Sequence, residues 1–284
     1  MIISSVFVLL SNGNGTFVIP TMSSRIYTYA GTSLTTADFN HDDILDIVSA
    51  DYMTLFISIL LGNGDGTFEK GTTFFETSCS KPTGLSVGDF NNDNHFDIVV
   101  ACFDSSKVIV FFGNSDGNFP SNVTLNTEKF SKPSSTAVND FNNDNYSDIV
   151  VICSLVRTIS IFIGHGNGSF DPQKIYRTGG GLDSLSITVA DLNEDTKQDV
   201  FFPYISKPAI GVMFGHGNGS FSEKMRLNFT SGYAFGAIAV NDINNDGHLD
   251  IIVPTFGICS AQIFLGHGNG NFDIYRILAI EPDV

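Results

Sequence analysis

Five short acidic loops carry most of the residues in this chain that could do chemistry. Each loop begins with Asp, and we number its positions from that residue. Positions 1, 5 and 9 are Asp in every loop and position 3 is Asn, as in Asp89, Asn91, Asp93 and Asp97. Alternating oxygen ligands on a tight loop, with a backbone carbonyl at position 7, are how a hard cation such as Ca²⁺ is wrapped. We therefore expect one calcium site in each loop, up to five ions in all.

The candidate ligands repeat from loop to loop. The expected side-chain ligands are Asp38, Asn40, Asp42, Asp46; Asp89, Asn91, Asp93, Asp97; Asp140, Asn142, Asp144, Asp148; Asp191, Asn193, Asp195, Asp199; and Asp242, Asn244, Asp246, Asp250. Position 7 varies in chemistry, which suits a backbone carbonyl ligand; its residues are Ile44, His95, Tyr146, Lys197 and His248.

Two other kinds of loop could carry this pattern, an EF-hand and a metal-free turn. An EF-hand is excluded because position 12, for example Val100, is never the required Glu; Asp at position 9 would close the site instead. A metal-free Asx-rich turn would explain a single loop. Five copies with three mutually repelling carboxylates favour a bound cation. Positions 1, 5 and 9 of these loops hold 5 × 3 = 15 of the 30 acidic residues, and five divalent ions would bring the net charge from −16 to near −6.

The fourth loop is expected to be the weakest site. Position 6 favours a left-handed backbone, which Asp43, Asn94, Asn145 and Gly247 accept. The fourth loop has the β-branched Thr196 there, and Lys197 beside it brings a positive charge towards the ion.

The elements that position these loops belong to a repeat of 51 residues. Both the acidic motif and a Gly-x-x-x-Gly-x-Phe motif, which ends for example at Phe119, recur at that spacing without insertion or deletion. Each repeat predicts four short strands. In the second repeat these are about Gly84–Phe90, Asp97–Phe103, Lys107–Phe112 and a fourth strand starting at Phe119. The Gly- and Asn-rich turn before Phe119 indicates a hairpin, and dense β-branched runs such as Asp148–Ile152 indicate strands covered on both faces. The sequence therefore predicts an all-β fold, a β-propeller of stacked four-stranded blades.

The expected organisation is a single propeller domain over 1–284. Its predicted blades are 33–83, 84–134, 135–185, 186–236 and 237–284, preceded by a half-blade at 1–32. The apolar Met1–Leu10 lacks the basic region and cleavage site of a signal peptide, and Val6–Leu10 is in register with later strands. We therefore expect a chain that is N-terminally incomplete.

The motifs resemble a known family. Asp-Phe-Asn-Asn-Asp-Asn-x-x-Asp-Ile-Val-Val from Asp89 and Phe-Phe-Gly-Asn-Ser-Asp-Gly-Asn-Phe at 111–119 resemble FG-GAP or VCBS-type repeats of integrin α-subunit-like propellers. The resemblance implies a ring of seven blades with Ca²⁺ in the loop between the first and second strands, so that this chain would be part of such a ring. Asn at position 3, and Gly at position 6 only at Gly247, depart from the family pattern.

The composition of the chain and the absence of several motifs limit the classes of function that it can have. The net charge of −16 argues against nucleic acid, and no apolar run is long enough for membrane insertion. No nucleophile elbow, phosphate loop or His-Glu-x-x-His zinc motif occurs, which indicates a protein that is not an enzyme. We expect an extracellular or cell-surface binding or adhesion module with a protein or glycan ligand. The alternatives are a lectin-like propeller, weakened by the absence of Trp, and the scaffold of a larger secreted enzyme.

The cysteines and the Asn-x-Ser/Thr sequons bear on the location of the protein. The four cysteines are too few for a disulfide scaffold, and buried thiols are expected. Six Asn-x-Ser/Thr sequons permit N-glycosylation of a secreted chain; they begin at Asn14, Asn122, Asn145, Asn167, Asn218 and Asn228. Turn chemistry explains several of these Asn equally well.

Overall fold

The computed structural model describes residues 8–18, 31–178, 186–204, 208–222, 225–229, 233–234, 238–256 and 260–279. Over these ranges the chain forms β-strands and turns, with no helix, and hence none that could cross a membrane. It divides into two compact units, one of Met1–Asn126 with Gly166–Ser169 and the other of Thr127–His165 with Phe170–Val284. Each unit is built from antiparallel sheets whose strands follow one another in sequence order.

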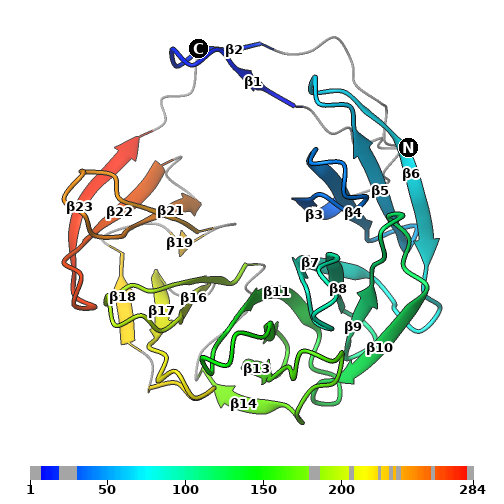
Figure 1. Ribbon diagram of the computed structural model, residues 1–284. Helices are drawn as coiled ribbons and strands as arrows, with labels where there is room; N and C mark the ends of the chain where they lie inside the picture. Colours follow the sequence, from blue (N-terminus) through cyan, green and yellow to red (C-terminus); the bar gives the residue numbers. More distant parts are fainter. Residues whose placement is uncertain are drawn as a thin grey trace. The chain divides into compact units, whose positions relative to one another are not determined.

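The first unit holds a short hairpin and two four-stranded sheets (Figure 1). The hairpin pairs β1 (Leu10–Ser11) with β2 (Phe17–Val18), at the register expected for the half-blade. The first blade contains β3 (Gly31–Ala37), β4 (Asp46–Asp51), β5 (Phe56–Gly62) and β6 (Phe68–Phe75); the second contains β7 (Pro82–Gly88), β8 (Asp97–Cys102), β9 (Lys107–Phe112) and β10 (Ser121–Asn126).

The second unit holds three further sheets. The third blade contains β11 (Pro133–Asn139), β12 (Asp148–Cys153), β13 (Thr158–Phe162) and β14 (Lys174–Arg177); the fourth contains β15 (Thr188–Ala190), β16 (Asp199–Tyr204), β17 (Ala209–Met213) and β18 (Met225–Asn228). In the fifth, β19 (Tyr233–Ala234) and β20 (Ala239–Asn241) both pair with β21 (Asp250–Phe256), which is followed by β22 (Ser260–Gly266) and β23 (Phe272–Ala279).

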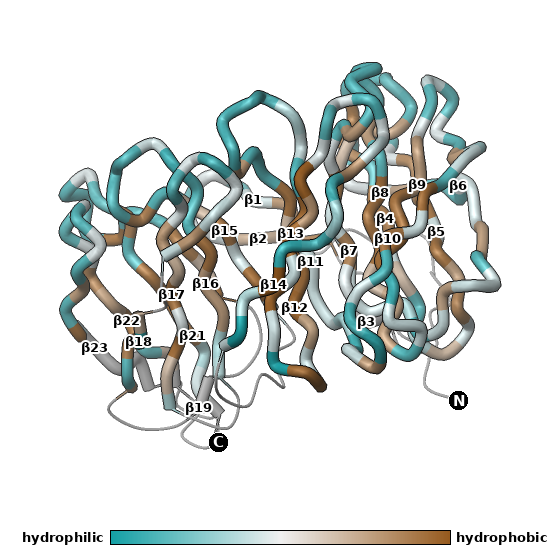
Figure 2. The backbone as a smooth tube through the Cα atoms, turned by 90° about the horizontal axis from the view of Figure 1, so that it is seen from below, coloured by the Kyte–Doolittle hydropathy of each residue, from teal (hydrophilic) through white to brown (hydrophobic). Residues whose placement is uncertain are grey.

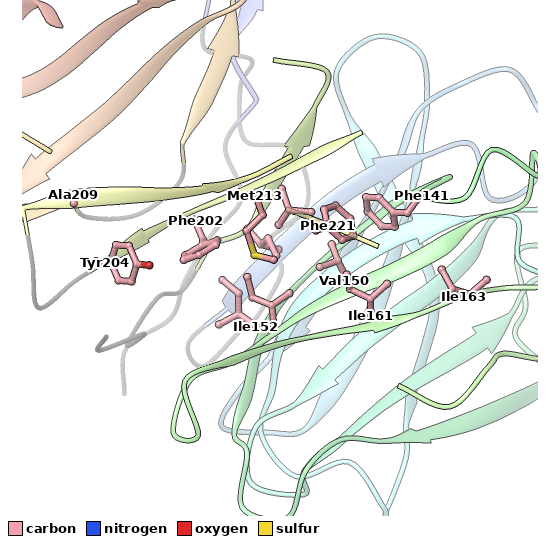
Figure 3. Close-up of a cluster of buried hydrophobic side chains, with 13 residues drawn as sticks. Phe141, Val150, Ile152, Ile161, Ile163, Phe202, Tyr204, Ala209, Met213 and Phe221 are labelled. Carbon is pink, nitrogen blue, oxygen red and sulfur yellow. The ribbon is translucent and has the colours of Figure 1, made fainter. Parts of the chain in front are cut away.

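The buried faces of neighbouring sheets form the cores. Every residue of β8, β12 and β16 is buried, which explains why these strands read as unbroken apolar runs rather than as alternating ones. Figure 2 shows hydrophobic residues along the strands and hydrophilic residues in the connecting loops. In the second unit, side chains of the third and fourth blades interdigitate, with Ile152 and Ile161 facing Phe202 and Met213 (Figure 3). Such packing on both faces fixes the register of each strand.

The sequence placed most strands correctly but extended some of them too far. The strand expected at Gly84–Phe90 is β7, which ends at Gly88. The backbone N–H of Phe90 leaves the sheet because it donates to Asp97 in the acidic loop, at 2.8 Å. Residues 179–181, a Gly-rich stretch that the sequence places at a blade junction, and Cys259 lie outside the described residues. The single-domain boundaries remain a prediction.

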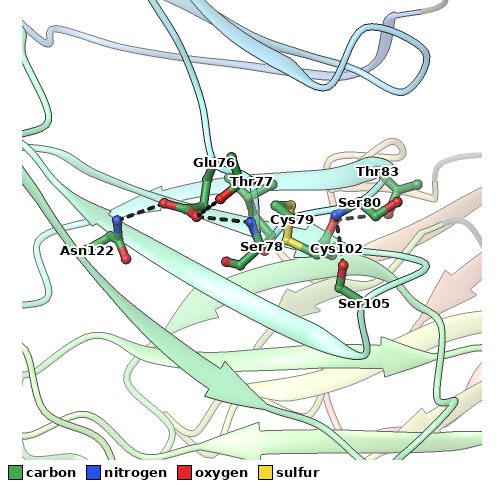
Figure 4. Close-up of a disulfide and its surroundings, with 11 residues drawn as sticks. Glu76, Thr77, Ser78, Cys79, Ser80, Thr83, Cys102, Ser105 and Asn122 are labelled. Atoms are coloured by element: carbon green, nitrogen blue, oxygen red, sulfur yellow. Dashed lines mark hydrogen bonds between the residues drawn. A yellow bond between two sulfur atoms is a disulfide. The ribbon is translucent and has the colours of Figure 1, made fainter.

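One expectation about the cysteines was wrong. Cys79 and Cys102 are not free thiols but form a disulfide, which joins the connection between β6 and β7 to the end of β8 (Figure 4). Cys153 occupies the equivalent place in the third blade and stays a free, buried thiol. Its partner position, one period after Cys79, is Phe130, so the third blade cannot form the same bridge.

Candidate functional site: five acidic loops

The acidic loops connect the first and second strands of the five blades and share one backbone conformation. Positions 4 and 6 have positive φ in every loop, between 58° and 89°. The left-handed residue expected at position 6 is confirmed, even at Thr196, where φ is 67°. Position 4 was not foreseen, and its residues are His41, Asn92, Asn143, Glu194 and Asn245.

The carboxylate at position 1 lies at the centre of each loop. In the second loop, Oδ2 of Asp89 accepts the backbone N–H of Asn94 at 2.8 Å, and Oδ1 accepts that of Asp93 at 3.2 Å. The other four loops make the same two bonds, at 2.7–2.9 Å and 3.1–3.3 Å respectively. These N–H groups wrap the loop around its first side chain.

Positions 3 and 5 come together beside that carboxylate. Asn91 Nδ2 donates to Asp93 Oδ2 at 2.9 Å, and Asp93 Oδ1 accepts the N–H of His95 at 2.9 Å. The amide oxygen at position 3 accepts the N–H of position 5 in the first, third, fourth and fifth loops. In the second loop, Asn91 Oδ1 is buried and has no hydrogen-bond partner. Three of the four side chains predicted to share an ion, those of positions 1, 3 and 5, are therefore within hydrogen-bonding reach of one another or of the same N–H group.

Asp at position 9 has a second role that sequence reasoning missed. It is fully buried, and both of its oxygens accept backbone N–H groups. Asp97 Oδ2 accepts from Phe90 at position 2, and Oδ1 accepts from Gly113 at the end of β9, each at 2.8 Å. All five loops repeat this pair of bonds at 2.7–2.9 Å. The side chain thus ties its loop to the third strand of the same blade.

The glycine whose backbone N–H donates the second of these bonds is part of the site. It lies 16 residues after the position-9 Asp in every repeat, as Gly62, Gly113, Gly164, Gly215 and Gly266. A Cβ at any of them would lie only 2.1–2.4 Å from the carbonyl oxygen of position 8, which no side chain can tolerate. The constant Asp-to-Gly spacing was the signal in the sequence that could have revealed it.

Burial raises the pKa of the position-9 Asp in the first four loops. Removal from water raises the pKa of Asp97 and of Asp148 to about 7, and that of Asp199 to about 6. The two bonded N–H groups work in the opposite direction, and the carboxylates at positions 5 and 1 raise the pKa further. The three Asp of a loop are therefore close enough to repel, and a cation placed among them would relieve that repulsion.

The ligand atoms of each loop are of the kind that a hard cation prefers, although they are not yet arranged around a single point. Among the described residues, no three His, Cys, Asp or Glu side chains are already arranged to hold a metal ion. Each carboxylate oxygen accepts one or two N–H groups here and has more than one lone pair, so it can also bind an ion. The ligands available are carboxylate, amide and backbone oxygens, which calcium prefers. In the second loop the buried, unpartnered Asn91 Oδ1 is available to bind such an ion.

The fourth loop differs from the others in its electrostatics. Lys197 Nζ lies 3.2 Å from Asp195 Oδ2, so its side chain turns into the loop rather than away from it. Although partial burial raises the pKa of Asp195, the backbone N–H and the ammonium group of Lys197 hold it below its ordinary value. The ammonium group of Lys197 is thus paired with Asp195 Oδ2, an oxygen that the ion would need as a ligand.

Neighbouring loops also touch through positions 4 and 7. In the first unit, His95 Nδ1 lies 2.6 Å from His41 Nε2. In the second unit, His248 Nδ1 lies 2.5 Å from Glu194 Oε1, which raises the pKa of His248. The sequence alone does not reveal these contacts, because the residues in each pair are 54 apart along the chain.

Comparison with known proteins identifies the repeat and the fold. A family model described as an FG-GAP-like repeat matches residues 42–100, 89–151, 140–202 and 204–253. No curated protein matches the chain in sequence.

Solved structures similar to the chain include an Agrocybe aegerita lectin that recognises non-reducing terminal N-acetylglucosamine, with a TM-score of 0.67 and 20% identity over 98% of this chain and 75% of that one. A putative 6-phosphogluconolactonase from Bacteroides uniformis gives a TM-score of 0.70 at 14% identity, covering 94% and 76%. Virginiamycin B lyase from Staphylococcus aureus gives 0.61 at 14%, covering 98% and 78%. These likenesses confirm the β-propeller fold with its 51-residue repeat.

Proposed function

Because the chain belongs to the FG-GAP-like repeat family, we propose that its acidic loops bind calcium and that the loaded propeller is a non-enzymatic binding or adhesion module outside the cell. The observation that carries the calcium proposal is the fivefold repetition of one oxygen-rich loop in which the Asp at positions 1 and 9 accept the same backbone hydrogen bonds. In each loop the side chains of positions 1, 3, 5 and 9 and the carbonyl of position 7 would hold the ion. The ion would supply the positive charge that these crowded carboxylates lack.

The disulfide supports a location outside the cytosol. Stable disulfides such as Cys79–Cys102 form in oxidising compartments and are rare in the cytosol. The sequons would then be open to glycosylation, and an extracellular calcium module is expected to bind its ions at roughly 10⁻⁴–10⁻³ M. A ligand of protein or glycan type is proposed for the surface. The lectin, the lactonase and the lyase share only the fold with this chain, and none of their activities is carried over.

Calorimetry tests the calcium proposal. An ion that binds the folded chain and not the unfolded one raises Tm by mass action. The protein stripped with EDTA should therefore melt lower than the same sample in excess Ca²⁺. Asp93→Asn should lose one equivalent of bound ion in a titration. Asp104→Asn, which removes the same charge from the Lys81 ion pair away from the acidic loops, should keep all of them. An unchanged Tm with and without Ca²⁺ would disprove the metal proposal.

A second experiment addresses the ligand. Immobilised protein is tested for binding to a glycan array and to extracellular matrix proteins, in Ca²⁺ and in EDTA. Binding to matrix proteins that EDTA removes supports an adhesion module, and selective glycan binding supports the lectin alternative. Turnover of a lactone by the purified chain would contradict the non-enzymatic proposal.

A further inference from the structure

The sequons of the chain occupy different structural positions in the fold. Three of them lie at the same place in the hairpin turns, where the Asn side chain stabilises the turn. Asn167 Oδ1 accepts the backbone N–H of Ser169 at 3.0 Å and its hydroxyl at 2.6 Å. Asn14 and Asn218 make the same two bonds. In a repeat without a sequon, Asp65 makes them with Thr67, at 2.8 and 2.6 Å. Turn chemistry therefore accounts for these Asn.

Asn145 is explained by the acidic loop. It occupies position 6 with φ of 66°, and its N–H donates to Asp140 Oδ2 at 2.7 Å. Asn and Asp accept such a backbone more readily than other residues that carry a side chain. Asn228 is exposed at the end of β18, but Thr230 of its sequon lies outside the described residues.

Asn122 is the sequon residue without a structural explanation. It lies inside β10, the edge strand of its sheet, where Asn is disfavoured. Its side chain is exposed and makes one long hydrogen bond, from Nδ2 to Glu76 Oε2 at 3.4 Å (Figure 4). Thr124, two residues on, lies on the same face of the strand and is also exposed. The equivalent residues one period before and after, Gly71 and Gln173, show that the fold does not require Asn here.

We propose that Asn122 is the principal acceptor of an N-linked oligosaccharide, an inference that rests on the proposed extracellular location. The donor is a lipid-pyrophosphate-linked oligosaccharide. A bond forms between Nδ2 and C1 of the first sugar, the bond from C1 to the pyrophosphate oxygen breaks, Nδ2 gives up one proton, and the lipid pyrophosphate leaves. The glycosylated amide keeps one N–H, which can still donate to Glu76.

The position gives the glycan a physical consequence. An exposed edge strand offers unpaired backbone groups to other chains, and proteins commonly block such edges. An oligosaccharide on Asn122 would shield the open edge of β10. Loss of the glycan should then increase self-association of the secreted protein while leaving the acidic loops unchanged.

The test is site mapping on the full chain, secreted from cultured eukaryotic cells behind a cleavable signal. Treatment with peptide N-glycosidase in ¹⁸O-water labels each Asn that carried a glycan, and mass spectrometry of the peptides measures occupancy. We expect Asn122 to have the highest occupancy. Thr124→Ala should remove one glycan from the intact mass, Thr124→Ser should retain it, and Asn167→Gln should leave the Asn122 glycan in place.

Two results would overturn the inference. One is an unmodified Asn122 peptide, whether or not glycans are found elsewhere. The other is an occupancy at Asn122 no higher than at Asn14, Asn167 and Asn218. Calcium titration of the same material separates this inference from the proposed metal sites. Ions bound without a glycan on Asn122 overturn the inference alone, and a glycan without bound ions overturns the metal proposal alone.

Discussion

Removing the positive charge of Lys197 should strengthen ion binding at the fourth loop. Its ammonium group lies 3.2 Å from Asp195 Oδ2, and an incoming ion must displace it. Breaking a partly exposed ion pair costs about 0–1 kcal/mol. Holding a single charge ~5 Å from a divalent ion in a water-like medium costs a further ~1–2 kcal/mol. The lysine side chain can swing away from the ion, which lowers the total cost. We therefore expect its removal to improve the free energy of calcium binding by about 1–2 kcal/mol, which is roughly a 5- to 30-fold change in affinity.

The assay is isothermal titration of Ca²⁺ into EDTA-stripped protein. Lys197→Gln should tighten the weakest class of sites by that factor and leave the others unchanged. Lys70→Gln is the matched control, because Lys70 is an exposed residue of β6 and its loss changes the net charge equally. A calcium dissociation constant of the weakest sites that stays the same in Lys197→Gln, or that Lys70→Gln shifts as much, would refute a direct effect of the Lys197 charge.

Thr196→Gly separates backbone strain from charge in the same loop. Thr196 has φ of 67° in a loop closed by hydrogen bonds alone, so the strain of a β-branched residue is incurred on folding and not on ion binding. That strain is about 1–2 kcal/mol, and the added freedom of Gly in the unfolded chain offsets about 0.5–1 kcal/mol of it. Urea unfolding in EDTA should show a small gain in stability, while the calcium constants should move less than in Lys197→Gln. A larger gain in the free energy of calcium binding than in the free energy of unfolding would contradict the assignment of the backbone strain to folding.

Two further predictions concern the metal-free protein. The pKa of Asp97 and of Asp148 is raised to about 7 in the folded state, so between pH 4 and 7 the folded chain holds protons that the unfolded chain releases. The free energy of unfolding should therefore fall as pH rises through that range, by at most ~1.4 kcal/mol per pH unit for each group; a Tm in EDTA that rises from pH 4 to 7 would contradict it. Ser49→Val should stabilise the first blade by about 1–2 kcal/mol, because the buried Ser49 hydroxyl has no hydrogen-bond partner and the equivalent residue of the next blade is Val100. Urea denaturation measures this, and Ser49→Ala, which removes the hydroxyl without filling its space, should gain less.

Much of the site could be predicted from the sequence because it is local. The positions of Asp89, Asn91 and Asp93 are set by a loop of nine residues, and their backbone N–H partners lie within five residues. The left-handed residue at position 6 follows from the same local geometry. The two buried hydrogen bonds accepted by Asp97 were harder to foresee, because the second donor, Gly113, directly follows another strand, β9, and is 16 residues away along the chain.

The sequence by itself determined the repeat, the four strands of each blade and the residues of the acidic loops. A strict period makes each repeat a copy of one local structure, and the apolar runs show which strands are covered on both faces. Only the tertiary structure decided which residues far apart in sequence meet. The Cys79–Cys102 bridge and the contact of His41 with His95 depend on where each connection lies against a neighbouring strand or loop. Periodicity specifies the direction in which a side chain points, whereas the packing of one sheet on the next determines what it contacts.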